Sequence, residues 1–170
     1  RIMKPLVSII MGSTSDLPVM EKACKWLDDN EIPFEVNALS AHRTPDAVEA
    51  FAKGAQERGI KVIIAAAGMA AALPGVIAAS TNLPVIGVPI KGMLDGLDAM
   101  LSIIQMPPGI PTATVGVNAA QNAAILAAQI IGLSDSAVAA KVAAHKAGLG
   151  AKIEKANKDL AEVKYNFKTN

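Results

Sequence analysis

Short runs of aliphatic and β-branched residues alternate with segments of helical apolar periodicity along most of this chain. The alternation is typical of a parallel β-sheet whose two faces are both covered by helices. The run LVSIIM at residues 6–11, which stops at Gly12, shows the buried-strand character clearly. The expected strands cover residues 6–11, 34–39, 62–66, 85–88 and 113–117. The expected helices cover residues 16–29, 45–58, 74–80, 94–104 and about 119–131.

The clearest of these helices is the one expected over residues 45–58. Thr44 is a favoured N-cap residue, and Pro45 stands at the first helical position, where its missing N–H is tolerated. Gly59 is expected to end the helix. The apolar residues keep the i, i+3, i+4, i+7 spacing of a face that packs on a sheet. They are Val48, Phe51, Ala52 and Ala55.

Five strands with helices between them predict an α/β fold. The expected architecture is a three-layer αβα sandwich of the flavodoxin-like kind around a central five-stranded parallel sheet. The order of the strands within the sheet does not follow from this pattern. We expect the sandwich to take up residues 3–133 as one domain, which agrees with a usual size of roughly 100 to 200 residues.

Residues 134–170 are expected to form a C-terminal helical extension of the same domain, interrupted near its middle by Gly148 and Gly150. Its apolar residues form only a narrow stripe among lysines and glutamates. We therefore expect this extension to pack on neighbouring subunits rather than to form a second domain. At the other end, Arg1 and Ile2 precede Met3 and are expected to be remnants ahead of the native start.

Charge and composition exclude several classes of function. The 16 Lys and Arg residues nearly balance 15 Asp and Glu, so no basic surface for nucleic acid or anionic lipid is expected. No apolar run reaches the ~20 residues of a membrane span and no signal peptide opens the chain, which favours a cytoplasmic protein. The single Cys24 cannot form an internal disulfide and is expected to be a small buried hydrophobic residue. No cluster of His and Cys has metal-ligand spacing.

Hydrophobic residues make up 52% of the chain, although aromatic residues make up only 3%. Small aliphatic side chains allow helices to approach a sheet, or one another, closely. A single chain of this size rarely needs so much apolar content, so part of it is expected to face another subunit.

Ligands of parallel α/β sheets bind beyond the carboxyl ends of the strands, so the loops that follow the strands are the candidate binding segments. The first loop reads GSTSD at residues 12–16 and leads into a helix. Its backbone N–H groups, its hydroxyls and the helix dipole together favour a phosphate. Ser13 and Asp16 would equally suit an ordinary capping box.

The second loop reads SAHRTP at residues 40–45 and places His42 beside Arg43. An arginine pairs with phosphate or carboxylate, and an imidazole exchanges a proton near neutral pH. The alternative is that both residues are ordinary members of a surface loop. The only other histidine, His145, belongs to the polar tail, so His42 is the candidate for acid–base chemistry.

The third loop, residues 67–75, contains no ionisable group. Its small residues would let backbone N–H groups approach a planar ligand, although a loop packed in the core would look the same. The later segment 105–111 carries three prolines, which suit either a rigid pocket wall or plain turns.

Taken together, these loops resemble one family, the class I N5-carboxyaminoimidazole ribonucleotide mutases of purine biosynthesis. The resemblance covers about residues 6–132 in the family's order and spacing, and SAHRTP after MGSTSD is a specific combination. The matching segments are MGSTSD (11–16), SAHRTP (40–45), AGMAAALPG (67–75), LPVIGVP (83–89), SIIQMPPGIPTAT (102–114) and NAAILAAQII (122–131).

This resemblance implies a flavodoxin-like subunit of a homo-octamer with active sites at subunit interfaces, and a reaction without metal, biotin or ATP. The implied reaction is an isomerisation. It moves a carboxylate from the exocyclic nitrogen of a 5-aminoimidazole ribonucleotide to ring carbon C4.

The resemblance also implies a role for each residue that matches the family's motifs. His42 matches the general acid/base, and Asp16 matches the partner of the ribose hydroxyls. Ser13, Ser15 and Arg43 match the phosphate ligands. Further residues of the three loops complete the expected substrate-binding set, and residues 68–71 among them match a backbone cradle for the migrating carboxylate. These further residues are Gly12, Ser40, Ala41, Gly68, Met69, Ala70, Ala71 and Leu73.

Two residues of the third loop depart from the family's usual AGGAAHLPG. Met69 stands in place of the second glycine, and Ala72 stands in place of the histidine. Met69 is expected to narrow the pocket or reorient the loop. Ala72 leaves a mechanism with one histidine. The segment 91–95 is also slightly shortened.

Two rival functions remain open on the sequence. One is a class II aminoimidazole ribonucleotide carboxylase, which takes free CO2. The other is a non-catalytic module that binds a nucleotide or a flavin. The scarcity of aromatic residues argues against a stacked flavin, because Trp26 falls in mid-helix and Tyr165 falls in the tail.

Overall fold

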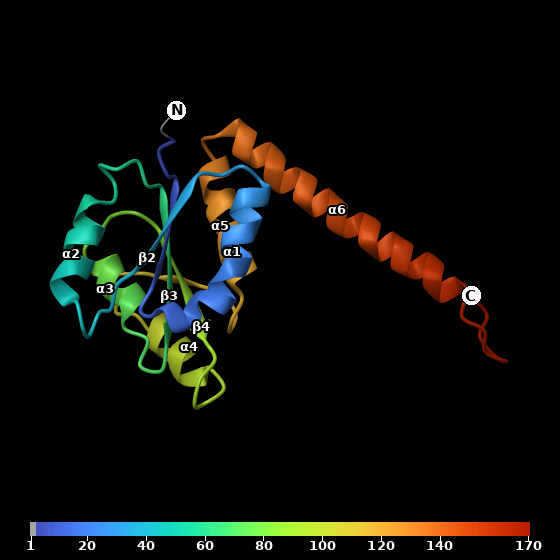
Figure 1. Cartoon of the computed structure of the whole chain (residues 1–170). Helices are drawn as coiled ribbons and strands as arrows, with labels where there is room; N and C mark the ends of the chain where they lie inside the picture. Colours follow the sequence, from blue (N-terminus) through green and yellow to red (C-terminus); the bar gives the residue numbers. More distant parts are fainter. Residues whose placement is uncertain (1–2) are drawn as a thin grey trace.

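The computed structural model describes residues 3–170; Arg1 and Ile2, expected to be remnants, lie outside the described residues. Five parallel strands form one sheet in the order β2-β1-β3-β4-β5, with helices on both faces (Figure 1). The α/β fold expected from the sequence is confirmed. The elements are β1 (Val7–Met11), η1 (Thr14–Asp16), α1 (Leu17–Asp29), β2 (Phe34–Ala38), α2 (Pro45–Gly54), β3 (Val62–Gly68), α3 (Leu73–Ala79), β4 (Val85–Ile90), α4 (Leu97–Ile104), β5 (Ala113–Thr114), α5 (Ala120–Gly132) and α6 (Ser136–Ala161).

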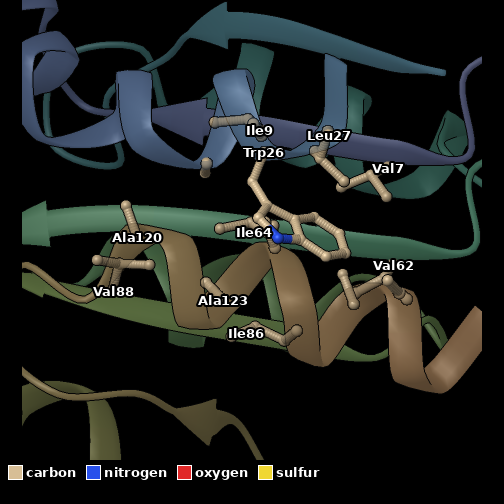
Figure 2. Close-up of a cluster of buried hydrophobic side chains, with 14 of the residues drawn as sticks. Val7, Ile9, Trp26, Leu27, Val62, Ile64, Ile86, Val88, Ala120 and Ala123 are labelled. Carbon is tan, nitrogen blue, oxygen red and sulfur yellow. The ribbon is translucent and has the colours of Figure 1, made fainter. Parts of the chain in front are cut away.

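The two faces of the sheet each bury a separate hydrophobic cluster. Helices α1 and α5 cover one face, and α2, α3 and α4 cover the other. Successive residues of a strand point to opposite faces, so Ile9 belongs to the first cluster and Ile10 to the second. In Figure 2, Trp26 of α1, Ile64 of β3 and Ala123 of α5 point toward one another. Both faces of the central strands are therefore dry, which explains their continuous apolar sequences.

The strand order places a topological switch point between β1 and β3. The chain moves from β1 outward to β2 and then returns past β1 to add β3 on the other side. The loops that follow β1 and β3 consequently diverge from adjacent strands and leave a crevice at the carboxyl edge of the sheet. The loop after β2 borders the same crevice because β2 is the other neighbour of β1.

Three strands differ in length from the expectation. Strands β3 and β4 each run two residues further than expected, to Gly68 and Ile90. Strand β5 contains only Ala113 and Thr114, not residues 113–117. Beyond it, Asn118 has a φ of 59°, where the chain turns toward α5.

Two helices are shorter than expected. Helix α2 ends at Gly54 rather than at residue 58, because residues 55–59 form tight turns that end at Gly59 with a φ of 92°. Helix α4 begins at Leu97 rather than at residue 94, because Asp95 and Gly96 adopt left-handed backbone angles that no helix interior accepts. The remaining expected helices and strands begin and end within one residue of the structure.

The C-terminal helix α6 runs without interruption from Ser136 to Ala161 and projects away from the sandwich (Figure 1). The expectation that Gly148 and Gly150 break it is wrong. A glycine in an exposed helix costs only about 1 kcal/mol, which the surrounding Ala, Lys and Glu offset. Asp135 begins the helix by accepting hydrogen bonds from the N–H groups of Ala137 and Val138, at 3.1 and 3.2 Å.

Polar contacts of α6 with Trp26 and Glu31 add to the packing of buried Val138 in fastening the first half of α6 to the sandwich. The indole N–H of Trp26 donates a hydrogen bond to Nδ1 of His145 at 3.1 Å, and the rings meet edge to face. Lys141 lies 3.8 Å from the carboxylate of Glu31. Within residues 3–170, no helix has the length and apolar character that crossing a bilayer requires.

Candidate functional site

A cavity of about 480 Å³ opens at the carboxyl ends of β1, β2 and β3. Every residue expected at the site lines it, and Ala67 and Ala72 line it as well. The lining consists of Gly12, Ser13, Ser15, Asp16, Ser40, Ala41, His42, Arg43, Ala67, Gly68, Met69, Ala70, Ala71, Ala72 and Leu73. The three loops that the sequence singled out therefore meet in one place, at the switch point of the sheet.

The first loop forms a short turn of its own ahead of α1. The hydroxyl of Ser13 accepts hydrogen bonds from the backbone N–H of Ser15 at 3.3 Å and from the Ser15 hydroxyl at 3.0 Å. Asp16 makes no capping hydrogen bond, so the alternative of a Ser13–Asp16 capping box is wrong. The result is a pair of exposed hydroxyls at the start of a helix, which is a favourable arrangement for an anion.

Asp16 lies half-buried at the end of this turn and faces the cavity. Burial raises the pKa of its carboxyl above the ordinary value, because the charged form loses water contacts. Hydroxyl donors from a bound molecule would restore the lost hydrogen bonds. The carboxylate is thus placed to accept hydrogen bonds from the hydroxyl groups of a ligand in the cavity.

The second loop is held by hydrogen bonds among its own residues. The Thr44 hydroxyl accepts from the backbone N–H of Ser40 at 2.9 Å and donates to the Ser40 carbonyl at 3.1 Å. The expected capping of α2 by this hydroxyl is therefore wrong, because the side chain turns back to Ser40. The Ser40 hydroxyl in turn accepts from the backbone N–H of Arg43 at 3.1 Å and from its Nε at 3.3 Å.

Arg43 connects the first two loops across the cavity edge. One terminal nitrogen of its guanidinium donates a hydrogen bond to the carbonyl of Gly12 at 2.9 Å. The guanidinium is thereby brought next to the turn that holds the Ser13 and Ser15 hydroxyls. A cation and two hydroxyls on one side of a cavity are the groups that bind a phosphate.

His42 lies between Ser40 and Thr44 at the exposed tip of the second loop. Within residues 3–170 its imidazole makes no hydrogen bond, and the residue lines the cavity, so no protein group competes with a ligand for its ring nitrogens. His145, in contrast, accepts the Trp26 indole N–H far along the chain. His42 is accordingly the histidine that is free to exchange a proton with a ligand.

The third loop supplies an uncharged wall. Met69 has a φ of 53°, a backbone conformation that suits glycine, and its side chain is 65% exposed. Ala71 and Leu73 are buried, and the N–H of Ala71 bonds to the carbonyl of Met69 at 2.8 Å. Met69 therefore lines the cavity while most of its surface stays open to solvent, and the loop holds a left-handed turn at this position.

The two lining residues absent from the predicted site come from the same segment. Ala67 reaches the cavity from within β3, because that strand extends beyond its expected end at residue 66. Ala72 stands at the N-cap of α3, where it offers no capping side chain. The segment 105–111 is absent from the lining, and Met106 instead packs beside Gly75 of α3. The described residues 3–170 hold no group of three His, Cys, Asp or Glu placed for a metal ion.

Comparison with known proteins agrees with this geometry. The family model described as AIR carboxylase matches residues 6–152. This chain belongs to the AIR carboxylase family. The match spans the whole sandwich and residues 136–152 of α6, so all three cavity loops lie within it. The resemblance to the N5-carboxyaminoimidazole ribonucleotide mutases is thereby confirmed.

Individual members of the AIR carboxylase family are similar over most of the chain. The N5-carboxyaminoimidazole ribonucleotide mutase of Pyrococcus horikoshii is 53% identical over 161 residues, which cover 94% of this chain and 91% of that protein. The phosphoribosylaminoimidazole carboxylase of Saccharomyces cerevisiae is 58% identical over 83% of this chain, but the match takes up only 25% of that protein. The crystal structure of Treponema denticola PurE superposes with a TM-score of 0.82 at 33% identity, covering 92% of this chain and 98% of that one.

Proposed function

We propose that this chain is an N5-carboxyaminoimidazole ribonucleotide mutase, an isomerase of purine biosynthesis. The observation that carries the proposal is the composition of one cavity. This cavity combines a turn suited to binding phosphate, one histidine that makes no hydrogen bond, and an uncharged wall of glycine and alanine. The similarity to curated mutases at 51–53% identity over nearly the whole chain supports the same activity.

The cavity divides into a polar side and an apolar side, and we assign the parts of the substrate accordingly. Ser13, Ser15 and Arg43 bind the phosphate through two hydroxyls and a charged fork. Asp16 accepts hydrogen bonds from the ribose hydroxyls, which offsets the cost of burying its charge. Gly12, Ser40, Ala41 and Leu73 border the same space and complete the contact surface for the nucleotide.

The reaction begins when the bond between the exocyclic nitrogen and the carboxylate carbon breaks. The electron pair remains on nitrogen, which takes up a proton, and CO2 is released into the cavity. Ring carbon C4 then attacks CO2 and forms the new carbon–carbon bond. The C4 proton must leave to restore the aromatic ring, and His42 is the group placed to accept it. The imidazole thus gives a proton in the first half and recovers one in the second, and no metal, biotin or ATP takes part.

The third loop suits the retention of CO2. Gly68, Ala70 and Ala71 present small groups and backbone N–H to a molecule that carries no charge. Holding CO2 beside C4 replaces a bimolecular recapture by a positioned one, an advantage that reaches about 7 to 11 kcal/mol in well-oriented reactions. Positioned proton transfer by His42 adds a further ~10²- to 10⁴-fold.

The proposed assembly is a homo-octamer in the cytoplasm with active sites at subunit interfaces and with residues 134–170 packed on neighbouring subunits. Exposed apolar side chains support it. Leu97 and Leu101 of α4 and Ile153 of α6 are 59%, 47% and 68% exposed in the single chain. Analytical ultracentrifugation tests the assembly: eight times the chain mass is expected, and a monomer or dimer at micromolar concentration contradicts it.

The decisive experiment for the activity uses substrate that carries ¹³C in the N-carboxylate, in buffer depleted of bicarbonate. A mutase transfers the label to C4 of the product without added CO2. A class II carboxylase instead ignores this substrate and needs CO2 with the unmodified ribonucleotide. The third possibility, a flavin-binding module, is disfavoured because Trp26 is buried against α6 and Tyr165 lies at the far end of the chain. A yellow protein without turnover would overturn the proposal.

A further inference from the structure

The loop of residues 40–44 is closed at its base by two residues, Ser40 and Thr44. Three hydrogen bonds join them. The Thr44 hydroxyl accepts from the Ser40 N–H and donates to the Ser40 carbonyl, and the Thr44 N–H donates to that same carbonyl at 2.8 Å. The hydroxyl therefore uses both its donor and an acceptor position on one partner residue. His42 stands halfway between the two ends of this closed loop.

Thr44 makes these bonds in place of the one that its position in the chain ordinarily favours. It occupies the N-cap of α2, where a threonine hydroxyl usually accepts from an N–H of the first helical turn. In this structure α2 has no side-chain cap. The hydroxyl thus contributes to the shape of the cavity loop and not to the end of the helix. Thr44 itself does not line the cavity, so it has no direct contact to offer a ligand.

His42 depends on this closure because no hydrogen bond of its own orients it within residues 3–170. Its ring makes no hydrogen bond within residues 3–170, whereas its neighbour Arg43 is tied to both Ser40 and Gly12. The backbone geometry of the loop consequently determines where the imidazole points. A general acid/base must hold its proton within hydrogen-bond reach of the reacting atom, and small displacements are costly in rate.

We propose that Thr44 is a positioning residue for His42: by closing the loop at Ser40, its hydroxyl holds the imidazole toward the cavity. The proposal rests on the proposed function of His42 as general acid/base. It assigns to Thr44 an effect on proton transfer and none on phosphate binding, because the bond from Arg43 to the Gly12 carbonyl and the bond between Ser15 and Ser13 involve neither Ser40 nor Thr44.

The kinetic experiment compares four proteins in the mutase assay: wild type, Thr44→Val, Thr44→Ser and Thr81→Val. Valine keeps the shape of threonine without the hydroxyl, and serine keeps the hydroxyl. Thr81 is the matched control, since its hydroxyl accepts a backbone N–H, that of Leu83 at 3.2 Å, in a turn away from the cavity. We expect kcat of Thr44→Val to fall at least ~10-fold with KM within about threefold, because a small misplacement of reacting groups costs up to ~10²-fold.

Thr44→Ser is expected to restore kcat to within about threefold of wild type, and Thr81→Val to match wild type. A Thr44→Val enzyme with undiminished kcat overturns the proposal, as does an equal loss of kcat in Thr44→Ser. A rise in KM without a loss of kcat also overturns it, because Thr44 would then serve ligand binding.

A second measurement does not depend on turnover. The chain contains two histidines, so its NMR spectrum has two sets of imidazole signals. Those of His145 serve as the internal reference. We expect Thr44→Val to shift or broaden the His42 signals while those of His145 and the strand amides stay unchanged. Unchanged His42 signals contradict the positioning role even in an active enzyme. If wild type has no mutase activity but the His42 signals respond, the proposed function fails and the positioning role stands.

Discussion

His42 carries the proposed chemistry without contributing to the fold. Its side chain is exposed and makes no hydrogen bond within residues 3–170, so His42→Asn removes no structural contact. We expect this variant to lose about 10²- to 10⁴-fold in kcat, the range for positioned proton transfer, while it still binds the product. Steady-state kinetics and isothermal titration calorimetry measure the two quantities. Near wild-type kcat would remove His42 from the mechanism.

Asp16 predicts a pH-dependent stability effect. Burial raises its pKa, so the folded protein holds the carboxyl proton more tightly than the unfolded chain does. Stability therefore falls as pH rises from the ordinary pKa of 3.8 through the raised value of the folded state. Asp16→Asn is expected to raise Tm near neutral pH, and the gain should vanish below the ordinary pKa. Thermal unfolding of both proteins across this range tests the sign; a lower Tm of the variant at about pH 7 contradicts it.

The roles of single residues could be predicted where the residue type carries the chemistry. His42, Arg43 and the serines of the first loop stand out by type and by position after a strand. The direction of the Thr44 hydroxyl could not be predicted, because a threonine before Pro45 is equally suited to capping α2. Its actual partner, Ser40, is four residues away and depends on the closed shape of the loop.

Among the elements, the starts of the strands were predicted to within one residue, whereas the ends of β3, β4 and β5, the end of α2 and the start of α4 were not. The apolar runs of β1, β3 and β4 can exist only between two helical layers. The late start of α4 depends on left-handed angles at Asp95 and Gly96, which the alternation of polar and apolar residues does not encode. The strand order also lay beyond the sequence pattern, since it depends on contacts between distant segments.

Strand β4 passes close beneath two helices at Gly87. A Cβ at this position would collide with Cγ2 of Ile103 in α4 and lie 3.4 Å from Cβ of Pro74 in α3. We expect Gly87→Ala to lower the free energy of unfolding by about 1 to 3 kcal/mol, the usual cost of overpacking a core. Gly92→Ala is the matched control, because no atom lies within 4 Å of its Cβ position. Urea unfolding measures both variants, and equal stabilities would contradict the close approach.

The attachment of α6 predicts a change in local opening. His145→Ala leaves the buried indole N–H of Trp26 without its acceptor. If the free energy of local opening falls by about 1 kcal/mol, amide exchange in the middle of α6 becomes roughly fivefold faster. The single tryptophan should also emit at longer wavelength. Lys155→Ala, which removes only an exposed pair with Asp159 on the same helix, is expected to change neither signal. Identical exchange in His145→Ala and wild type would contradict the attachment.

For the whole molecule, the cavity followed from the sequence because parallel strands bring their carboxyl ends to one edge. Residues 12–16, 40–45 and 67–75 are far apart in the chain, yet the strand order β2-β1-β3 makes them neighbours. The uninterrupted course of α6 could not be foreseen. Its two glycines disfavour a helix locally, and the competing terms differ by only about 1 kcal/mol per glycine.

The exposed methionine of the third loop is a site at which oxidants can act on the molecule. Met69 lies at the rim of the cavity, and the residue with its thioether side chain is 65% exposed. Peroxide oxidises such a side chain to a sulfoxide, which is more polar than the thioether. Only methionine sulfoxide reductases reduce it back. Mild peroxide should therefore inhibit this protein, and Met69→Gly should resist it; mass spectrometry of the modified peptide, followed alongside activity, measures both. Oxidation of Met69, which holds a left-handed backbone conformation that suits glycine, would make the proposed activity in purine synthesis depend on the redox state of the surroundings.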